Sequence, residues 1–311
     1  MKILLLGKDG QVGWELQRAL APLGELVALG RRPPRRTGPD APTGAGDELR
    51  ADLADAEALA RTVRAVAPDI IVNAAAYTAV DKAESEPALA AAINAVAPGV
   101  LANEAARLGA LLVHYSTDYV FDGSGVRPWA EGDATGPVSV YGRTKLEGEQ
   151  AIAAAGGRHL IFRTSWVYAA RGGNFAKTML RLAGERDSLQ VIDDQIGAPT
   201  GADLIADITA HAVTQACRSP ALTGLYHLAA AGETSWHAYA QFVVERARAE
   251  GLPLKAGAAD IAAVPSSAYP TAARRPLNSR LDTSRLRQAF GLTLPPWQAG
   301  VARMIDEFLE K

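Results

Sequence analysis

The sequence of 311 residues predicts an α/β fold, in which helices cover both faces of a doubly wound parallel sheet. Three observations predict it: short apolar runs alternate with helical patterns, a glycine-rich turn follows the first run, and a Tyr and a Lys lie one helical turn apart near residue 141. Such sheets bind ligands outside the carboxyl ends of their strands, where these motifs fall. We therefore expect a Rossmann-type NAD(P)-binding domain at residues 1–165 and a smaller mixed α/β domain, mainly for substrate binding, at residues 166–311.

The strands and helices of the first half follow from hydrophobic periodicity. Continuous apolar runs, typical of strands buried in a parallel sheet, cover residues 2–6, 25–29, 69–73, 111–116 and 159–164. Apolar residues at helical spacing lie between them, at residues 11–21, 55–67, 87–108 and 139–155. Asp55 stands where it would cap the second of these helices.

The second half is less regular, and some of its segments are expected to return to the sheet. Helical patterns cover residues 175–183, 203–218, 236–249 and 297–310, with short strands at 189–192 and 224–228. Six prolines between residues 251 and 296 predict looped structure there. The segment 30–47, rich in Arg and Pro, predicts a mobile surface loop.

Composition excludes several classes of protein. A formal charge of −2 gives no electrostatic reason to expect nucleic acid as a partner. The single cysteine, Cys217, excludes an internal disulfide and fits the cytoplasm; we expect it at an apolar position of its helix. No run approaches the roughly 18 apolar residues of a membrane span, and the apolar start serves as the first strand.

The glycine-rich turn predicts a pyrophosphate site. Gly7, Gly10 and Gly13 let the backbone approach the phosphates, and the helix that follows offers free N–H groups and the positive end of its dipole. A tight turn without a ligand is the alternative. The spacing Gly-x-x-Gly-x-x-Gly is typical of the short-chain dehydrogenases.

Three further segments bear on the coenzyme. At the end of the second strand, Arg31 could pair with a 2′-phosphate, which favours NADPH over NADH; the alternative is a solvated basic loop. Asp52 and Leu53 could flank the adenine, although Asp52 could equally cap the next helix. After the third strand, Ala74, Ala75 and Ala76 leave room for the coenzyme, or simply pack closely.

A hydroxyl pair and an amine predict carbonyl reduction. Tyr141 and Lys145 lie four residues apart and so on one side of a helix, where Lys145 is expected to hold the nicotinamide ribose and lower the pKa of Tyr141. Tyr141 would then protonate the oxygen of a ketone as hydride arrives, and Thr117 would bond the same oxygen. Asp118 would orient a sugar hydroxyl, or be a turn residue. This chemistry needs no metal, and we predict none.

Longer segments place these residues in a family. Residues 114–123 and 140–148 closely resemble the dTDP-4-dehydrorhamnose reductases, which are extended short-chain dehydrogenases. The likeness continues at residues 72–87, 162–168, 174–180, 194–201 and 274–281, and so covers both halves of the chain. The segment 30–47 departs from the family because it is longer and more basic, and Gly30 stands where some members have an acidic residue.

The resemblance implies reduction of dTDP-4-dehydro-β-L-rhamnose to dTDP-β-L-rhamnose by NADPH or NADH, in the last step of that sugar nucleotide's synthesis. It assigns the catalytic roles to Thr117, Tyr141 and Lys145, and further coenzyme contacts to Gln11 and Val12. Substrate contacts match Thr117, Asp118 and Trp166, whose indole would pack on the sugar, with Arg274 or Arg275 on the diphosphate.

Two other functions remain open at this point, and a homodimer is compatible with the sequence. One is a regulatory subunit of the same family that keeps the fold without the reductase activity. The other is a related sugar-nucleotide enzyme, either another ketosugar reductase or an epimerase; copurified nucleotide would favour the epimerase.

Overall fold

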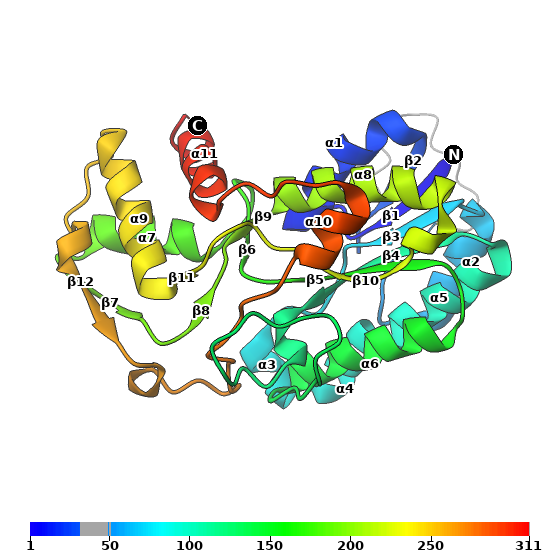
Figure 1. Cartoon of the computed structure of the whole chain (residues 1–311), viewed down its shortest axis with the longest axis horizontal. Coiled ribbons are helices and arrows are strands. Elements are labelled where there is room, and N and C mark those ends of the chain that lie inside the picture. Colours follow the sequence, from blue (N-terminus) through cyan, green and yellow to red (C-terminus); the bar gives the residue numbers. More distant parts are fainter. Residues whose placement is uncertain (32–48, 50, 311) are drawn as a thin grey trace, which may run out of the picture.

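The computed structural model describes residues 1–31, 49 and 51–310. Its centre is a six-stranded, wholly parallel sheet with the order β10-β5-β4-β3-β1-β2, and the doubly wound fold predicted from the sequence is confirmed (Figure 1). The strands are β1 Lys2–Leu6, β2 Glu25–Leu29, β3 Ile70–Asn73, β4 Leu111–Thr117, β5 His159–Thr164 and β10 Gly224–His227.

Helices cover both faces of the sheet because successive strand residues point to opposite sides. Ile3 and Leu5 of β1 face a core shared with α1 (Gln11–Leu20), α8 (Ala202–Arg218) and α10 (Ser284–Phe290). Leu4 and Leu6 face a second core shared with α2 (Ala56–Val66), α5 (Ala97–Leu108) and α6 (Val140–Ala154). Asp55 caps α2 as predicted, accepting a hydrogen bond from the amide of Ala58.

The strand order reverses between β1 and β3, and this switch point fixes the place of the site. In register, Leu6 lies opposite Leu29 on one side and Asn73 on the other, so that β1, β2 and β3 end level. Strand β4 runs on past β3, to Thr117. Side chains that follow these strands therefore gather at one edge of the sheet.

The helical pattern at residues 87–108 is confirmed, with one irregularity. Helix α4 (Pro87–Ala91) passes through a π-helical turn (Ala92–Val96) into α5. Pro98 has no N–H for the carbonyl of Asn94 four residues earlier, which accounts for the wider turn.

The same helix, Pro87–Leu108, is long and apolar enough by mean hydropathy to cross a membrane, contrary to our reading of the sequence. Almost half of it is buried inside the protein, and it packs on α2 and α6, as core helices of globular proteins do. We attach no membrane function to it.

The rest of the chain builds a smaller part with its own core, on the left of Figure 1. Helices α7 (Phe175–Glu185), α9 (Trp236–Ala249) and α11 (Trp297–Leu309) pack together beside strands β7 (Leu189–Ile192) and β12 (Ile261–Val264). Short pairs join β6 (Val167–Tyr168) to β9 (Thr200–Gly201) and β8 (Ile196–Gly197) to β11 (Thr234–Ser235). Single 3-10 turns lie at Ala21–Leu23, Asp118–Val120, Pro220–Leu222, Ala258–Asp260 and Ser266–Ala268.

Some expectations from the sequence were wrong. Residues 251–296 are not all loops, because β12 and α10 form between their prolines, and the short helix α3 (Val80–Ser85) had no expected counterpart. Cys217 lies on α8 but is exposed. Residues 32–48, most of the expected basic loop, lie outside the described residues. The division at residue 165 stays a prediction.

Candidate active site

The glycine turn lies where β1, β2 and β3 end. Gly7 has a positive φ of 86°, and a Cβ there would stand 2.7 Å from the amide nitrogen of Ala75. The amides of Gly7 and Lys8 donate to the carbonyl of Leu29 at 2.9 and 3.2 Å, which holds the turn on β2. A Cβ at Gly13 would clash with the Gly7 carbonyl.

This close-packed cradle fits a pyrophosphate. The first residue before α1 is Gly10, and no side chain caps the N-terminus of that helix. The first N–H groups of a helix have no partner within it, and they attract anions. The residues present therefore suit the phosphates of a dinucleotide.

The two residues that open α1 point in different directions. Gln11 places its amide nitrogen 3.3 Å from the carbonyls of Arg171 and Gly173, so that a loop of the second half lies against the turn. Val12 packs on the core beneath the sheet's first strand.

The end of β2 carries charges of both signs. Arg31 is exposed there. Gly30 has no acidic side chain of its own, but a Cβ at this position would clash with the carboxylate of Asp9 from the glycine turn. An acidic group therefore stands at the end of β2 after all, contributed by another segment.

The remaining residues predicted to meet the coenzyme differ in how open they are. Asp52 accepts a hydrogen bond from the amide of Ala54 at 3.0 Å, while Asp55 caps α2, so Asp52 is not the cap. Leu53 is buried in the core. Residues 74–76 are partly exposed beyond β3, and Ala74 donates to the carbonyl of Leu6.

The hydroxyl-bearing segment after β4 is buried. Thr117 donates to one carboxylate oxygen of Asp118 at 3.1 Å and accepts from the amide of Tyr119. The other Asp118 oxygen is buried without a hydrogen-bond partner. Burial raises the pKa of Asp118 to about 6, while bonds to Ser279 and Thr117 act against this rise. A free buried acceptor of this kind suits a ligand hydroxyl.

Tyr141 lies beside this segment, near the start of α6. Its ring meets that of Tyr119 edge to face, with 5.5 Å between centroids. Burial raises the pKa of Tyr141 to about 12, and its hydrogen bond with Thr117 opposes the rise. Thr117, Asp118 and Tyr141 are therefore brought together as predicted from their order in the sequence.

Lys145 lies on the same helix as Tyr141, but its amine is hydrogen-bonded to β4. Its Nζ donates to the carbonyl of Tyr115 at 2.6 Å and lies 3.1 Å from Nε2 of His114. Only 1% of its surface is exposed, and burial lowers its pKa to about 8. The expectation that Lys145 lowers the pKa of Tyr141 is wrong here: burial raises this pKa, Lys145 is not among the groups that shift it, and the amine is bonded to β4.

Three buried polar residues near Lys145 were not predicted from the sequence: Asn73, His114 and Asn94. Asn73 and His114 lie opposite each other on β3 and β4, and their side chains meet at 3.1 Å. Asn94, in the π-helical turn, bonds both backbone groups of Tyr77 and the hydroxyl of Thr144. The sequence offered two signals for them: Asn73 is a polar residue at the end of an apolar strand, and Pro98 lies inside a helical pattern four residues after Asn94.

Trp166 adopts a conformation that is unusual for a bulky residue. Its φ is 49°, in the left-handed region, and its indole stacks on that of Trp236 with 3.7 Å between ring centroids. Such outliers cluster at binding and active sites. Trp166 is partly exposed and follows β5, two residues after its end.

The two arginines differ in their surroundings. Arg275 donates to Asp81 of α3 at 2.8 Å, so its charge is already paired, although its Nε is buried without a partner. Arg274 is exposed. Their segment reaches the site through the strap at residues 276–282.

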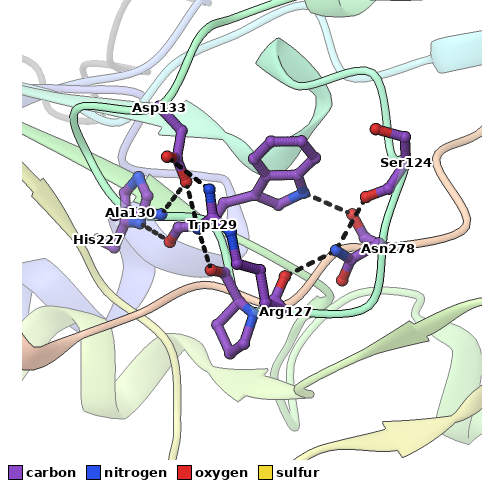
Figure 2. Close-up of polar contacts among 8 residues, drawn as sticks. Ser124, Arg127, Trp129, Ala130, Asp133, His227 and Asn278 are labelled. Atoms are coloured by element: carbon purple, nitrogen blue, oxygen red, sulfur yellow. Dashed lines mark hydrogen bonds and ion pairs between the residues drawn. The ribbon is translucent and has the colours of Figure 1, made fainter.

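This strap is fixed by the loop between β4 and α6, as Figure 2 shows. The Asn278 side chain donates to the carbonyls of Ser124 and Arg127, and the Trp129 indole donates to the carbonyl of Asn278. Arg127 makes two 2.8 Å contacts with Asp133, which closes the loop on itself. The loop and strap thus support Ser279 near Asp118.

Among the residues that the structure describes, no group of three or more His, Cys, Asp or Glu is placed to hold a metal ion.

Comparisons with known proteins match the chain over nearly its whole length. The family model described as the RmlD substrate binding domain matches residues 1–310. A dTDP-4-dehydrorhamnose reductase of Escherichia coli (strain K12) is 56% identical over 307 residues, which is 99% of this chain and 98% of the relative.

Solved structures give the same result. The structure of a dTDP-4-dehydrorhamnose reductase from Clostridium acetobutylicum superposes with a TM-score of 0.84 at 32% identity, covering 100% of both chains. A dTDP-4-dehydrorhamnose reductase from Bacillus anthracis, solved in complex with NADP, has a TM-score of 0.83 at 31% identity, covering 98% of this chain and 99% of that one.

Proposed function

The chain belongs to the dTDP-4-dehydrorhamnose reductase family, and we infer that it reduces the 4-keto group of dTDP-4-dehydro-β-L-rhamnose to give dTDP-β-L-rhamnose. This is the last step in the synthesis of that sugar nucleotide. The observation that carries the inference is the 56% identity to a reductase of this name over 99% of the chain, in the substrate half as well as the coenzyme half.

NADPH or NADH, when bound, supplies the hydride for the carbonyl carbon. We assign its phosphates to the turn at Gly7, Gly10 and Gly13, with Gln11, Val12, Leu53 and residues 74–76 around it. At the end of β2, Arg31 favours a 2′-phosphate, whereas the Asp9 carboxylate opposes one and suits a free 2′-hydroxyl. We therefore propose use of both coenzymes; titration with each, followed by nicotinamide fluorescence, measures the preference.

Tyr141 is the proposed acid. Its pKa is raised by burial, so the phenol carries its proton at neutral pH and can give it to the carbonyl oxygen as negative charge develops there. Thr117, bonded to the same phenol, is placed to donate to that oxygen as well. Lys145 is the proposed partner of the nicotinamide ribose, since its hydrogen bond to the Tyr115 carbonyl leaves another N–H of the amine free.

The substrate contacts are proposals supported by unused polar groups. The unpartnered oxygen of Asp118 would accept a sugar hydroxyl, and the indole of Trp166 would cover an apolar face of the ring. Arg274 is free to approach the diphosphate, and Arg275 would have to share its charge with Asp81. A cytoplasmic location and a homodimer stay predictions.

Replacing the proposed acid tests this function. Tyr141→Phe should lower kcat at least about 100-fold with freshly made dTDP-4-dehydro-β-L-rhamnose and NADPH, because the proton donor is lost. Loss of NADPH absorbance and the dTDP-rhamnose formed are the two readouts. Tyr119→Phe is the matched control, since it removes a neighbouring hydroxyl and keeps the ring contact.

If the Tyr141→Phe variant were as active as the unaltered protein, Tyr141 would not be the proton donor. No reaction of the unaltered protein with either coenzyme, despite coenzyme binding, would instead support a regulatory subunit with the reductase fold.

A further inference from the structure

Strand β4 extends beyond the end of β3, and this leaves the backbone carbonyl of Tyr115 without a partner on β3. The last pair in register is Asn73 with His114, yet β4 continues to Thr117. The amide of Leu111 bonds toward β3, and strand alternation turns the backbone groups of Tyr115 to that same side. Lys145 donates to the Tyr115 carbonyl at 2.6 Å. The lysine amine therefore takes the place of the missing strand.

His114 joins this amine to the end of β3. Its Nε2 lies 3.1 Å from Lys145 Nζ, and its Nδ1 lies 3.1 Å from the side-chain nitrogen of Asn73. Both His114 and Asn73 are 1% exposed. The Asn73 side-chain oxygen accepts from the amide of Ala75 at 3.3 Å. One chain of hydrogen bonds thus runs from the residues beside the glycine turn to the lysine.

We propose that His114, anchored by Asn73, is a positioning residue that holds the ε-amino group of Lys145 on the Tyr115 carbonyl. The proposal rests on the catalytic role given to Lys145 above. It adds a residue that touches neither coenzyme nor substrate but sets where the lysine lies and how readily it gains a proton.

The direction of the hydrogen bonds follows from the Asn73 amide. Because its oxygen accepts from Ala75, its nitrogen donates to Nδ1 of His114, and a neutral imidazole then carries its proton on Nε2. Burial and the nearby Lys145 hold the pKa of His114 well below its usual range, so the ring is neutral. The Nε2–H points at Lys145 and favours the uncharged amine.

Other charged groups around Lys145 act differently. Burial lowers the pKa of Lys145 to about 8, and Glu149, one turn further on α6, raises it. Glu149 is itself paired with Arg163 of β5 at 2.6 Å, and Tyr141 lies one turn before the lysine. A lysine that titrates near neutral pH is suited to proton exchange with an acid at pH 7.

Two substitutions of His114 distinguish the roles of its two ring nitrogens. A glutamine amide reaches about as far as Nε2 and can donate to Lys145, whereas an asparagine amide reaches only the place of Nδ1. His114→Asn should raise the pKa of Lys145 by about one unit and lower kcat about tenfold, with the pH profile of kcat moving in the same direction. The His114→Gln variant should have nearly the same pKa of Lys145 and nearly the same kcat as the unaltered protein.

The titration is read by NMR on protein with ¹³C-labelled lysine. The chain has seven lysines, and Lys145→Arg identifies the signal of interest by its loss. His159→Asn is the matched control: it makes the same change on β5, where the ring bonds the carbonyl of Gly157. That variant should leave the Lys145 titration unchanged.

Two results would overturn the proposal: a Lys145 titration in His114→Asn that matches the unaltered protein, or equal shifts in the Asn and Gln variants, which would indicate packing alone. The titration needs no substrate. A Lys145 shift in a protein that does not reduce the ketosugar would therefore sink the proposed function and leave the positioning role standing.

Discussion

Asp118 combines a cost in stability with an acceptor proposed for the substrate, because it is buried and one of its carboxylate oxygens has no partner. Its pKa is raised from 3.8 to about 6, which means that the folded protein holds the proton more tightly than the unfolded chain does. For a carboxyl group with a raised pKa, the penalty is absent below about pH 4 and complete above about pH 6. Stability should therefore fall as pH rises through this window.

Replacing this carboxylate should stabilise the fold. Asp118→Asn is expected to raise the free energy of unfolding at pH 7.5 by about 3 kcal/mol, the equivalent of roughly two pKa units, with a smaller gain at pH 5. Urea denaturation at the two pH values measures it, and the KM for the ketosugar should rise in the same variant.

Asp122 provides the contrast. It is exposed, and hydrogen bonds from Ser124 lower its pKa, so Asp122→Asn should reduce stability at pH 7.5. A gain in both variants, or a gain for Asp118→Asn that is the same at pH 5, would contradict the assignment of the raised pKa to Asp118.

Sequence predicted the chemistry of single residues better than their partners. Thr117, Asp118 and Tyr141 meet because the first two lie at the end of β4 and the third lies at the start of α6, the helix that follows the same strand. The partners of Lys145 could not be predicted, since they depend on β4 running past β3 and on a histidine inside an apolar strand. The carboxylate of Asp9 beside Gly30 likewise requires the turn to fold back on β2.

At the scale of elements, the π-helical turn is the feature most closely tied to the site. It turns Asn94 inward, where its side chain bonds Tyr77 on one strand connection and Thr144, the neighbour of Lys145, on α6. A regular helix through Pro98 would lack the N–H for the Asn94 carbonyl. π-helical turns occur often at functional sites.

Removing this amide should loosen the packing of α6. Asn94→Ala is expected to lower the free energy of unfolding by about 2 to 3 kcal/mol, because three hydrogen bonds of a buried side chain are lost and the partly buried backbone groups of Tyr77 lose their partner. Chemical denaturation measures the change. Asn103→Ala, at an exposed position of α5, should change stability by less than about 0.5 kcal/mol; equal losses would show that helix propensity, not the buried contacts, is responsible.

Elements with a strong repeating pattern could be predicted to within a few residues. Strands β1, β2 and β5 and helix α9 have the predicted bounds, since continuous apolar runs determine the strands and apolar residues at a period of 3.6 determine the helix. Two short elements in the proline-rich segment, β12 and α10, were not predicted. Their formation depends on contacts with β7 and with the core beside β10, which sequence periodicity does not report.

At the scale of the whole molecule, the site draws on both parts of the chain. The glycine turn, β4 and α6 come from the first half, while Trp166 and the strap at residues 276–282 come from the second. The strap is held by the loop of residues 124–133 through the side chain of Asn278 (Figure 2). The identity to a known reductase extends over both parts, as it must if the substrate as well as the coenzyme is shared.

The most direct test of the reductase assignment follows the hydride itself. NADPH deuterated on the transferred position of its nicotinamide should give dTDP-rhamnose with deuterium at C4 of the sugar, one equivalent for each NADPH consumed, as read by NMR of the product. Product without deuterium at C4, or NADPH consumption without dTDP-rhamnose, would contradict direct hydride transfer to the 4-keto group at this site.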